Sequence, residues 1–207
     1  MIIKTNNLSK RYSSEWVFNN FSYKFQNGIY AITGPNGSGK STLLQVLWGQ
    51  LPPTSGQLYY FDNDGEIPME SIHNNLVIVA PYLELIEEFT LFEIIKFHFS
   101  FKKIRNSTID TVLEKLEMSH HKDKPIYQFS SGMKQRLKLG LAFYSDVKLY
   151  FFDEPTTNLD SKAINWFWEN FEQISSDSIV FIGSNQESDY PITAKKLNLF
   201  ALSGYLS

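Results

Sequence analysis

The sequence predicts an α/β fold with a mixed central sheet, an antiparallel β lobe at the amino-terminal end and an inserted helical lobe. Three observations lead to this prediction. Aromatic residues alternate with polar ones from Phe21 to Phe25, which is a strand pattern. Apolar residues recur at helical spacing over 91–144. Strand patterns then return at 149–152 and 179–183 around one helix, and this alternation is typical of a parallel sheet.

The β-rich first third contains a turn signal and a strand before the first helix. Asn27-Gly28 is a favoured hairpin dipeptide, and it predicts a turn into a strand over 29–33. A helix over 41–50 should end near Gly49, before two prolines. Further strands are expected over 57–61, 76–80 and 197–202, and the helical insert over about 86–145.

Composition limits the possible functions of this chain of 207 residues, which we expect to form one domain. The net charge of −3 argues against a nucleic-acid partner, because no excess of cations attracts phosphates. Cysteine is absent, which excludes disulfides, thiolate metal sites and cysteine nucleophiles. Neither a secretory signal nor an apolar run of about 18 residues is present. We therefore expect a cytoplasmic protein without a membrane span.

A glycine-rich loop carries the strongest functional signal. Residues 34–41 read Gly-Pro-Asn-Gly-Ser-Gly-Lys-Ser, which fits the G-x-x-x-x-G-K-[ST] pattern of a P-loop between a strand and a helix. Such a loop turns backbone N–H groups and a helix N-terminus toward phosphates. Lys40 would reach the β- and γ-phosphates, Ser41 would bind Mg²⁺, and Thr42 would add a phosphate hydrogen bond. The other candidate nucleotide ligands of the loop are Asn36, Gly37, Ser38 and Gly39. The alternative is a merely flexible Gly/Ser loop.

A pair of carboxylates follows the apolar run 149–152. Asp153 and Glu154 would lie at the carboxyl end of a buried strand, where ligands of open α/β sheets bind. Asp153 is suited to the Mg²⁺ shell, and Glu154 could orient or deprotonate a water that attacks the γ-phosphate. Without the phosphate loop, the pair would be only a solvated strand end.

Together these motifs resemble the ATP-binding subunit of ABC transporters, and within that family the short exporter type. Between the two Walker motifs, residues 129–136 read Phe-Ser-Ser-Gly-Met-Lys-Gln-Arg, which is similar to the family signature L-S-G-G-Q, with Ser131 and Met133 departing from it. The resemblance implies that Ser130 and Gly132 bind a γ-phosphate held by the opposite subunit. Taken alone, Ser130 could be an ordinary helix N-cap.

Two further segments carry the resemblance beyond the Walker motifs. Tyr12 would stack on adenine, although a tyrosine at a strand end needs no ligand. Residues 155–160 resemble the family's D-loop, in which Asp160 helps to align the two sites of a dimer. Asp160 could also cap the helix that begins near Ser161, and both roles are compatible.

Two departures from the family pattern concern catalysis. The family's Q-loop glutamine should fall near residues 80–82, which read Ala-Pro-Tyr. The family's switch histidine is replaced by Asn185, which can donate a hydrogen bond to phosphate but cannot become cationic. We expect ATP binding with slow hydrolysis, in which Glu154, Lys40 and Asn185 are the catalytic candidates.

The resemblance implies a homodimer or heterodimer that closes around ATP and drives a separate transmembrane permease at the cytoplasmic face of the membrane. A partner helix could bind between residues 81–89 and the helix 91–101, where Phe89, Phe97 and Phe101 are candidates; these rings could instead pack the helical lobe. A regulatory module with impaired hydrolysis and a soluble ABC ATPase without a transport role are the alternatives. The four histidines have no metal-ligand spacing.

Overall fold

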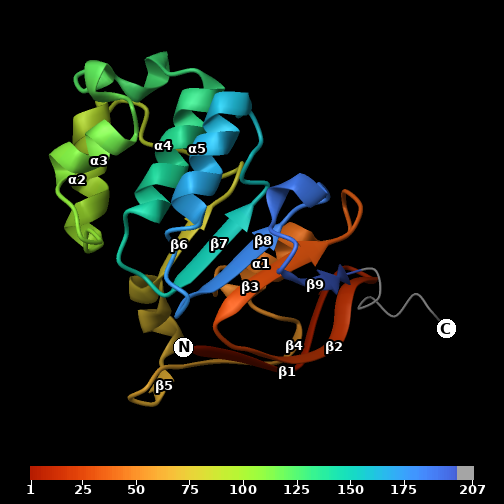
Figure 1. Ribbon diagram of the computed structural model, residues 1–207. Helices are drawn as coiled ribbons and strands as arrows, with labels where there is room; N and C mark the ends of the chain where they lie inside the picture. Colours follow the sequence, from red (N-terminus) through yellow and green to blue (C-terminus); the bar gives the residue numbers. More distant parts are fainter. Residues whose placement is uncertain (200–207) are drawn as a thin grey trace.

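The structure is a computed structural model that describes residues 1–199, and its strands form two sheets (Figure 1). The antiparallel sheet has the order β2-β1-β4-β5, and the parallel sheet has the order β6-β7-β8-β3-β9. The strands are β1 (Ile2–Tyr12), β2 (Glu15–Phe25), β3 (Gly28–Thr33), β4 (Ser55–Phe61), β5 (Glu66–Ile67), β6 (Leu76–Val79), β7 (Leu149–Asp153), β8 (Ile179–Gly183) and β9 (Lys195–Asn198). The helices are α1 (Lys40–Leu47), α2 (Leu91–Phe101), α3 (Ile109–Lys115), α4 (Ser131–Phe143) and α5 (Ser161–Phe171).

The α/β fold with an antiparallel β lobe and helices inserted between β6 and β7 is as predicted. One detail of the prediction, the mixed strand direction of the central sheet, is wrong. Over residues 1–199 this sheet pairs only parallel strands, and the antiparallel pairs form a sheet of their own. The reason is burial: β7 and β8 are buried at every position, so they need cover on both faces, which helical crossovers between parallel strands supply.

The predicted hairpin at Asn27-Gly28 is also wrong. The strand before it, β2, pairs with β1, whereas β3 pairs with β8 and β9 in the other sheet. Gly28 has φ 139°, so the dipeptide redirects the chain from one sheet to the other. The observed hairpin joins β1 to β2, where Ser13 has a positive φ of 51°.

The parallel sheet has an apolar core on each face. Tyr150, Phe152 and Val180 face the core that contains α4, α5 and the helical lobe. The alternate residues Phe151 and Phe181 face the second core, which contains α1 and the antiparallel sheet. Figure 1 displays the same layers, with α4 and α5 on one side of the parallel strands and β1, β2 and β4 on the other.

Local signals at the helix ends agree with the structure. Thr90 and Glu93 form a reciprocal capping box at the start of α2. Helix α1 ends at Leu47, earlier than predicted, and Gly49 follows with φ 85°. The predicted terminal strand is found as β9, while residues 200–202 lie outside the described residues. None of the helices found in residues 1–199 has the length and apolar character needed to cross a bilayer.

Candidate functional site

The phosphate loop joins β3 to α1 at the carboxyl end of the parallel sheet. Gly37 and Gly39 both lie in the left-handed region, with φ 79° and 95°. A Cβ added at Gly39 would stand 2.0 Å from Cγ1 of Val17, so β2 packs directly onto the loop. Glycine is therefore required at position 39 for two reasons, the positive φ and the close approach of Val17.

Lys40 lies folded over the loop and is only 6% exposed. Its Nζ donates to the carbonyl oxygens of Gly34 (2.9 Å) and Pro35 (3.1 Å), so the loop itself holds the ammonium group in place. Beside it lies a cavity of about 240 Å³. This cavity is lined by Asn36, Gly37, Gly39, Lys40, Ser41, Thr42 and Glu154. The structure thus brings most of the predicted phosphate ligands and the predicted catalytic carboxylate to one place.

Asp153, the last residue of β7, has a buried carboxylate whose oxygens both lack a hydrogen bond of ordinary length within residues 1–199. Burial raises the pKa of Asp153, while the nearby Ser41 hydroxyl and Lys40 ammonium act to lower it. A buried carboxylate beside a hydroxyl offers oxygen ligands of the kind that suit a hard divalent cation. Ser41 and Asp153 therefore fit the Mg²⁺ that the sequence predicts.

Glu154 has an unusual backbone for a residue with a side chain. Its φ is 48°, in the left-handed region, and its N–H donates to Gly183 O at 2.8 Å. Such a conformation costs about 1–3 kcal/mol and is concentrated at functional sites. The turn places Glu154 on the wall of the phosphate cavity, one residue beyond the buried Asp153.

A second cavity of about 470 Å³ adjoins the outer side of the phosphate loop. It is lined by the loop residues Pro35 to Gly39, by Thr42, and by the hairpin residues Tyr12, Glu15, Trp16 and Val17. Tyr12, the predicted adenine-stacking residue, is 51% exposed. Sequence reasoning missed Trp16, whose ring lies 5.4 Å from the Arg11 guanidinium. The position of Trp16 in the sequence could have indicated it, because Trp16 lies near the start of the strand that pairs with the strand of Tyr12.

Asn185 and Tyr82 occupy the two places where the sequence departs from the family pattern. Nδ2 of Asn185 donates to Oδ1 of Asn36 at 3.0 Å, so the loop after β8 reaches the phosphate loop. The Tyr82 hydroxyl lies close to Asp153 and Gln45, and burial, with the negative charge of Asp153, raises its pKa to about 12. A neutral phenol, rather than a glutamine amide, thus stands near the predicted metal ligand.

The signature residues Ser130 and Gly132, and Asp160 of the predicted D-loop, are not among the residues that line either cavity. Ser130 accepts a hydrogen bond from Met133 N (3.2 Å) and caps α4, and Asp160 caps α5 by accepting from Ala163 N (2.8 Å). Both side chains thus have the capping roles that the sequence left open.

The signature helix contacts the loop that follows Glu154. A Cβ at Gly132 would stand 2.9 Å from Asn158 O. The buried Gln135 donates to Pro155 O at 2.7 Å. The signature is therefore held against the predicted D-loop of the same chain.

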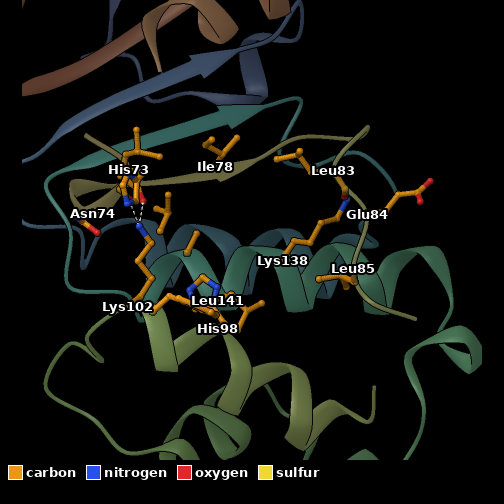
Figure 2. A pocket seen from close by; sticks show the side chains of 14 residues that line it. His73, Asn74, Ile78, Leu83, Glu84, Leu85, His98, Lys102, Lys138 and Leu141 are labelled. Carbon is orange, nitrogen blue, oxygen red and sulfur yellow. Dashed lines mark hydrogen bonds between the residues drawn. The ribbon is translucent and has the colours of Figure 1, made fainter. Parts of the chain in front are cut away.

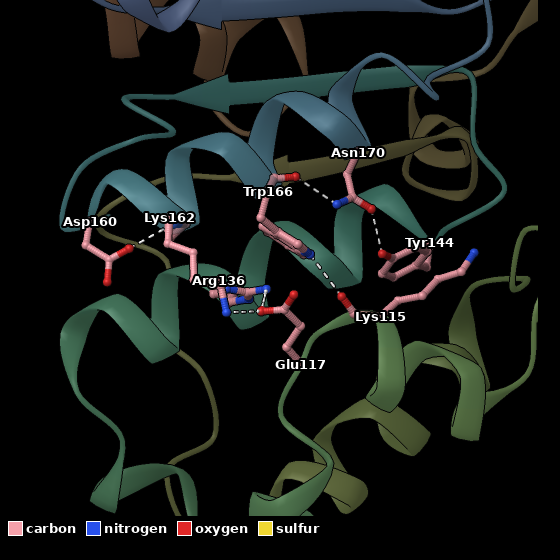
Figure 3. Close-up of polar contacts among 9 residues, drawn as sticks. Lys115, Glu117, Arg136, Tyr144, Asp160, Lys162, Trp166 and Asn170 are labelled. Atoms are coloured by element: carbon pink, nitrogen blue, oxygen red, sulfur yellow. Dashed lines mark hydrogen bonds and ion pairs between the residues drawn. The ribbon is translucent and has the colours of Figure 1, made fainter.

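Polar contacts also tie α4 to α5 and to the end of α3 (Figure 3). Glu117 forms ion pairs with Arg136 (2.9 Å) and Lys162 (3.0 Å). The Arg136 guanidinium also lies 4.4 Å from the centre of the Trp166 ring. Trp166 Nε1 donates to Lys115 O at 2.9 Å. These contacts stabilise the position of the signature helix on the core.

Comparison with known proteins identifies the family. A model of the ABC transporter family matches residues 18–157. The chain belongs to the ABC transporter family. A relative, the lantibiotic transport ATP-binding protein SrtF of Streptococcus pyogenes, is 30% identical over 188 residues (89% of this chain, 80% of that protein). The bacitracin transport ATP-binding protein BcrA of Bacillus licheniformis is 34% identical over 172 residues (79% of this chain, 54% of that protein).

Solved structures agree on the ABC cassette fold. A structure of a dimeric bacterial ABC transporter cassette has a TM-score of 0.77 and 23% identity, and the match covers 95% of this chain and 94% of that one. The resemblance inferred from the Walker and signature segments is therefore confirmed: the chain is an ATP-binding subunit of the ABC transporter family.

Proposed function

We propose that this ABC transporter subunit binds ATP with Mg²⁺ and hydrolyses it slowly to drive a separate transmembrane partner. One observation carries the proposal: the phosphate loop and Glu154 line the same cavity of about 240 Å³. Backbone N–H groups of the loop and the start of α1 favour phosphate there. The adjoining cavity beside Tyr12 and Trp16 offers aromatic rings for adenine.

Each predicted site residue then has a role in the reaction. Lys40 would release its two hydrogen bonds to carbonyl oxygens and bind the β- and γ-phosphates instead. Ser41 and Asp153 would hold Mg²⁺, which would supply positive charge against the phosphates. Glu154 orients or deprotonates the attacking water. Asn185 donates a hydrogen bond to the γ-phosphate, and its neutral amide stabilises the transition state less than a cation would.

The working unit we propose is a dimer of two such subunits, identical or different. Ser130 and Gly132 do not line the phosphate cavity of their own chain, and they stand at the N-terminus of α4. That helix end carries a partial positive charge and free N–H groups, which suit the γ-phosphate of an opposite subunit. The Ser130 oxygen accepts from Met133 N, so its hydrogen stays available for a phosphate.

A groove on the helical lobe supports a site for the transmembrane partner (Figure 2). Its cavity of about 560 Å³ lies between β6, the segment after it, α2 and α4. Of the three predicted aromatics, Phe101 lines the groove and is 71% exposed, and Phe97 is 42% exposed beside it. Phe89 packs instead against the core, as the alternative interpretation expects.

Two lysines fix the floor of this groove. Lys138 of α4 donates to Ala80 O and Leu83 O, both at 3.2 Å. Lys102, after α2, donates to Leu76 O at 2.9 Å and also to His73 O. Burial lowers the pKa of both lysines. The groove is therefore held in shape by contacts between the helical lobe and the edge strand β6, and it offers a partner helix an apolar surface. We place the subunit at the cytoplasmic face of the membrane through this contact.

The test of this function is ATP binding and turnover by the purified chain, with and without Mg²⁺. Calorimetry should detect ATP binding in the wild type and a loss of affinity of about 10-fold or more in Lys40→Ala. Turnover should need Mg²⁺. Wild-type protein that does not bind ATP would overturn the proposal. Binding without turnover would favour a regulatory module, the candidate that Asn185 and Tyr82 support because they replace a histidine and a glutamine.

A further inference from the structure

A buried carboxylate that none of the proposed catalytic steps uses lies behind the site. Asp189 ends the short helix η4 (Glu187–Asp189) and is 2% exposed. Each of its oxygens accepts one hydroxyl: Thr156 Oγ1 donates to Oδ1 and Ser184 Oγ donates to Oδ2, both at 2.5 Å. Within residues 1–199 no cation forms an ion pair with it. Burial of a carboxylate is costly without such partners, so these two hydrogen bonds sustain it.

The two hydroxyls belong to the two loops that carry the proposed catalytic side chains. Thr156 is two residues beyond Glu154, in the loop after β7. Ser184 immediately precedes Asn185, in the loop after β8. Thr156 and Asp189 are 33 residues apart in the chain, and Asp189 accepts hydrogen bonds from side chains of both loops.

A carboxylate also fixes the direction of these hydrogen bonds, because it can only accept. Ser184 must therefore donate to Asp189, which leaves its oxygen lone pairs free for another donor. Gln186 N occupies that position at 3.0 Å. The turn that presents Asn185 is thus closed from both sides, by Asp189 and by Gln186. Asn185 itself is left to reach Asn36 with its amide.

We propose that Asp189 is a positioning residue for ATP hydrolysis: its buried carboxylate ties the Glu154 loop to the Asn185 loop, so that both side chains face one γ-phosphate together. This inference rests on the proposed ATPase function. It assigns no contact between Asp189 and the nucleotide. Its effect is geometric, since a displacement of about 1 Å in a catalytic group can cost about 100-fold in rate.

The kinetic test compares Asp189→Ala and Asp189→Asn with Glu187→Gln, a matched control on the same short helix. Glu187 is exposed and its side chain pairs only with Lys196 in the described part of the chain. Asp189→Ala should lower kcat by about 10- to 100-fold, while KM for ATP changes by less than about twofold. Asp189→Asn, which keeps one acceptor oxygen, should lose less. Glu187→Gln should match the wild type.

Thr156→Val extends this test to the bridge itself. As a single substitution it should lower kcat. Combined with Asp189→Ala it should cause no further loss, because the same bridge is already broken. If Asp189→Ala lowers ATP affinity and the melting temperature along with kcat, Asp189 has only a structural role. That result would overturn the proposal. Additive losses in the double variant would also overturn it.

Hydrogen exchange tests the bridge without requiring hydrolysis. In the wild type, ATP with Mg²⁺ should slow exchange in residues 154–160 and 184–189 together. In Asp189→Ala, both segments should exchange faster without nucleotide, and ATP should protect them unequally. Equal protection of both segments in the variant would contradict the bridge. If the wild type has no turnover, hydrolysis is refuted while this exchange experiment still decides the role of Asp189.

Discussion

Asn185 and Asn36 are joined by a hydrogen bond of 3.0 Å that closes the loop after β8 onto the phosphate loop. The two residues are 149 positions apart in the chain. Nδ2 of Asn185 is the donor, so the amide group that we propose to face the γ-phosphate also contacts the phosphate loop. Because an amide cannot take up a proton, this contact has no cationic form near neutral pH.

A cation at this position should accelerate hydrolysis. We expect Asn185→His to raise kcat by about 10-fold, since an imidazole can share the developing charge on the phosphate. Asn185→Ala, which has no donor, should instead lower it. Steady-state turnover with Mg²⁺ measures both. Equal rates in Asn185→His and the wild type would mean that the missing histidine is not what limits the reaction.

Position 39 should tolerate no side chain, because a Cβ added at Gly39 would lie 2.0 Å from Val17 Cγ1 and the φ there is 95°. Gly39→Ala should lower the free energy of unfolding by about 1–3 kcal/mol and weaken ATP binding, both measurable by urea unfolding and calorimetry. Gly37→Ala separates the two causes, since its φ is 79° but its Cβ would meet nothing within 4 Å. Val17→Ala should recover part of the stability lost in Gly39→Ala. A milder effect at Gly39 than at Gly37 would contradict the clash.

His98 should make stability depend on pH. Burial, helped by the charge of Lys102, lowers its pKa to about 4, and its Nε2 lies 2.9 Å from Ser145 Oγ. The unfolded chain protonates this histidine below about pH 6.5 but the folded chain does not, so the free energy of unfolding falls as pH drops from 6.5 toward 4.

Between pH 7 and pH 5 this loss should be about 2 kcal/mol. Urea unfolding at the two pH values measures it. His98→Gln should remove that part of the pH dependence, and His120→Gln, on an exposed turn, is the control. A pH dependence unchanged by His98→Gln would show that His98 is not its source.

Phe101→Asp should weaken the association of the subunit with membranes of its own cells. Phe101 lines the groove and is 71% exposed, so a carboxylate there would oppose an apolar partner helix without disturbing a core. Ile192→Asp is the matched control, because Ile192 is 96% exposed but lies after η4, away from the groove. Cosedimentation with membranes and ATP binding should be measured in parallel. Equal cosedimentation of the two variants would contradict a partner site in this groove.

Features that depend on a short stretch of sequence could be predicted. The phosphate loop, the carboxylates at the end of β7 and the cap at Asp160 each follow from a few adjacent residues. The hairpin at Asn27-Gly28 failed because its turn signal is local, whereas the partners of β3 come from residues 179–183 and 195–198. Sheet membership is decided by burial over the whole chain.

The missed site features share this long-range origin. Val17 reaches Gly39 only because the β1–β2 hairpin folds over the phosphate loop. The bridge from Thr156 to Asp189 joins two loops that become neighbours only when β7 and β8 pair. No spacing rule links such residues, so sequence reasoning has no signal for them.

The most direct test of the account is a comparison of the wild type with Glu154→Gln, by ATP turnover with Mg²⁺ and by size exclusion in ATP. We predict that the variant binds ATP, loses turnover by about 100-fold or more, and elutes as a dimer only with ATP. Because glutamine keeps the size and backbone of Glu154, loss of activity would reflect the carboxylate itself. Wild-type turnover in the variant, or a monomer in saturating ATP, would contradict the account.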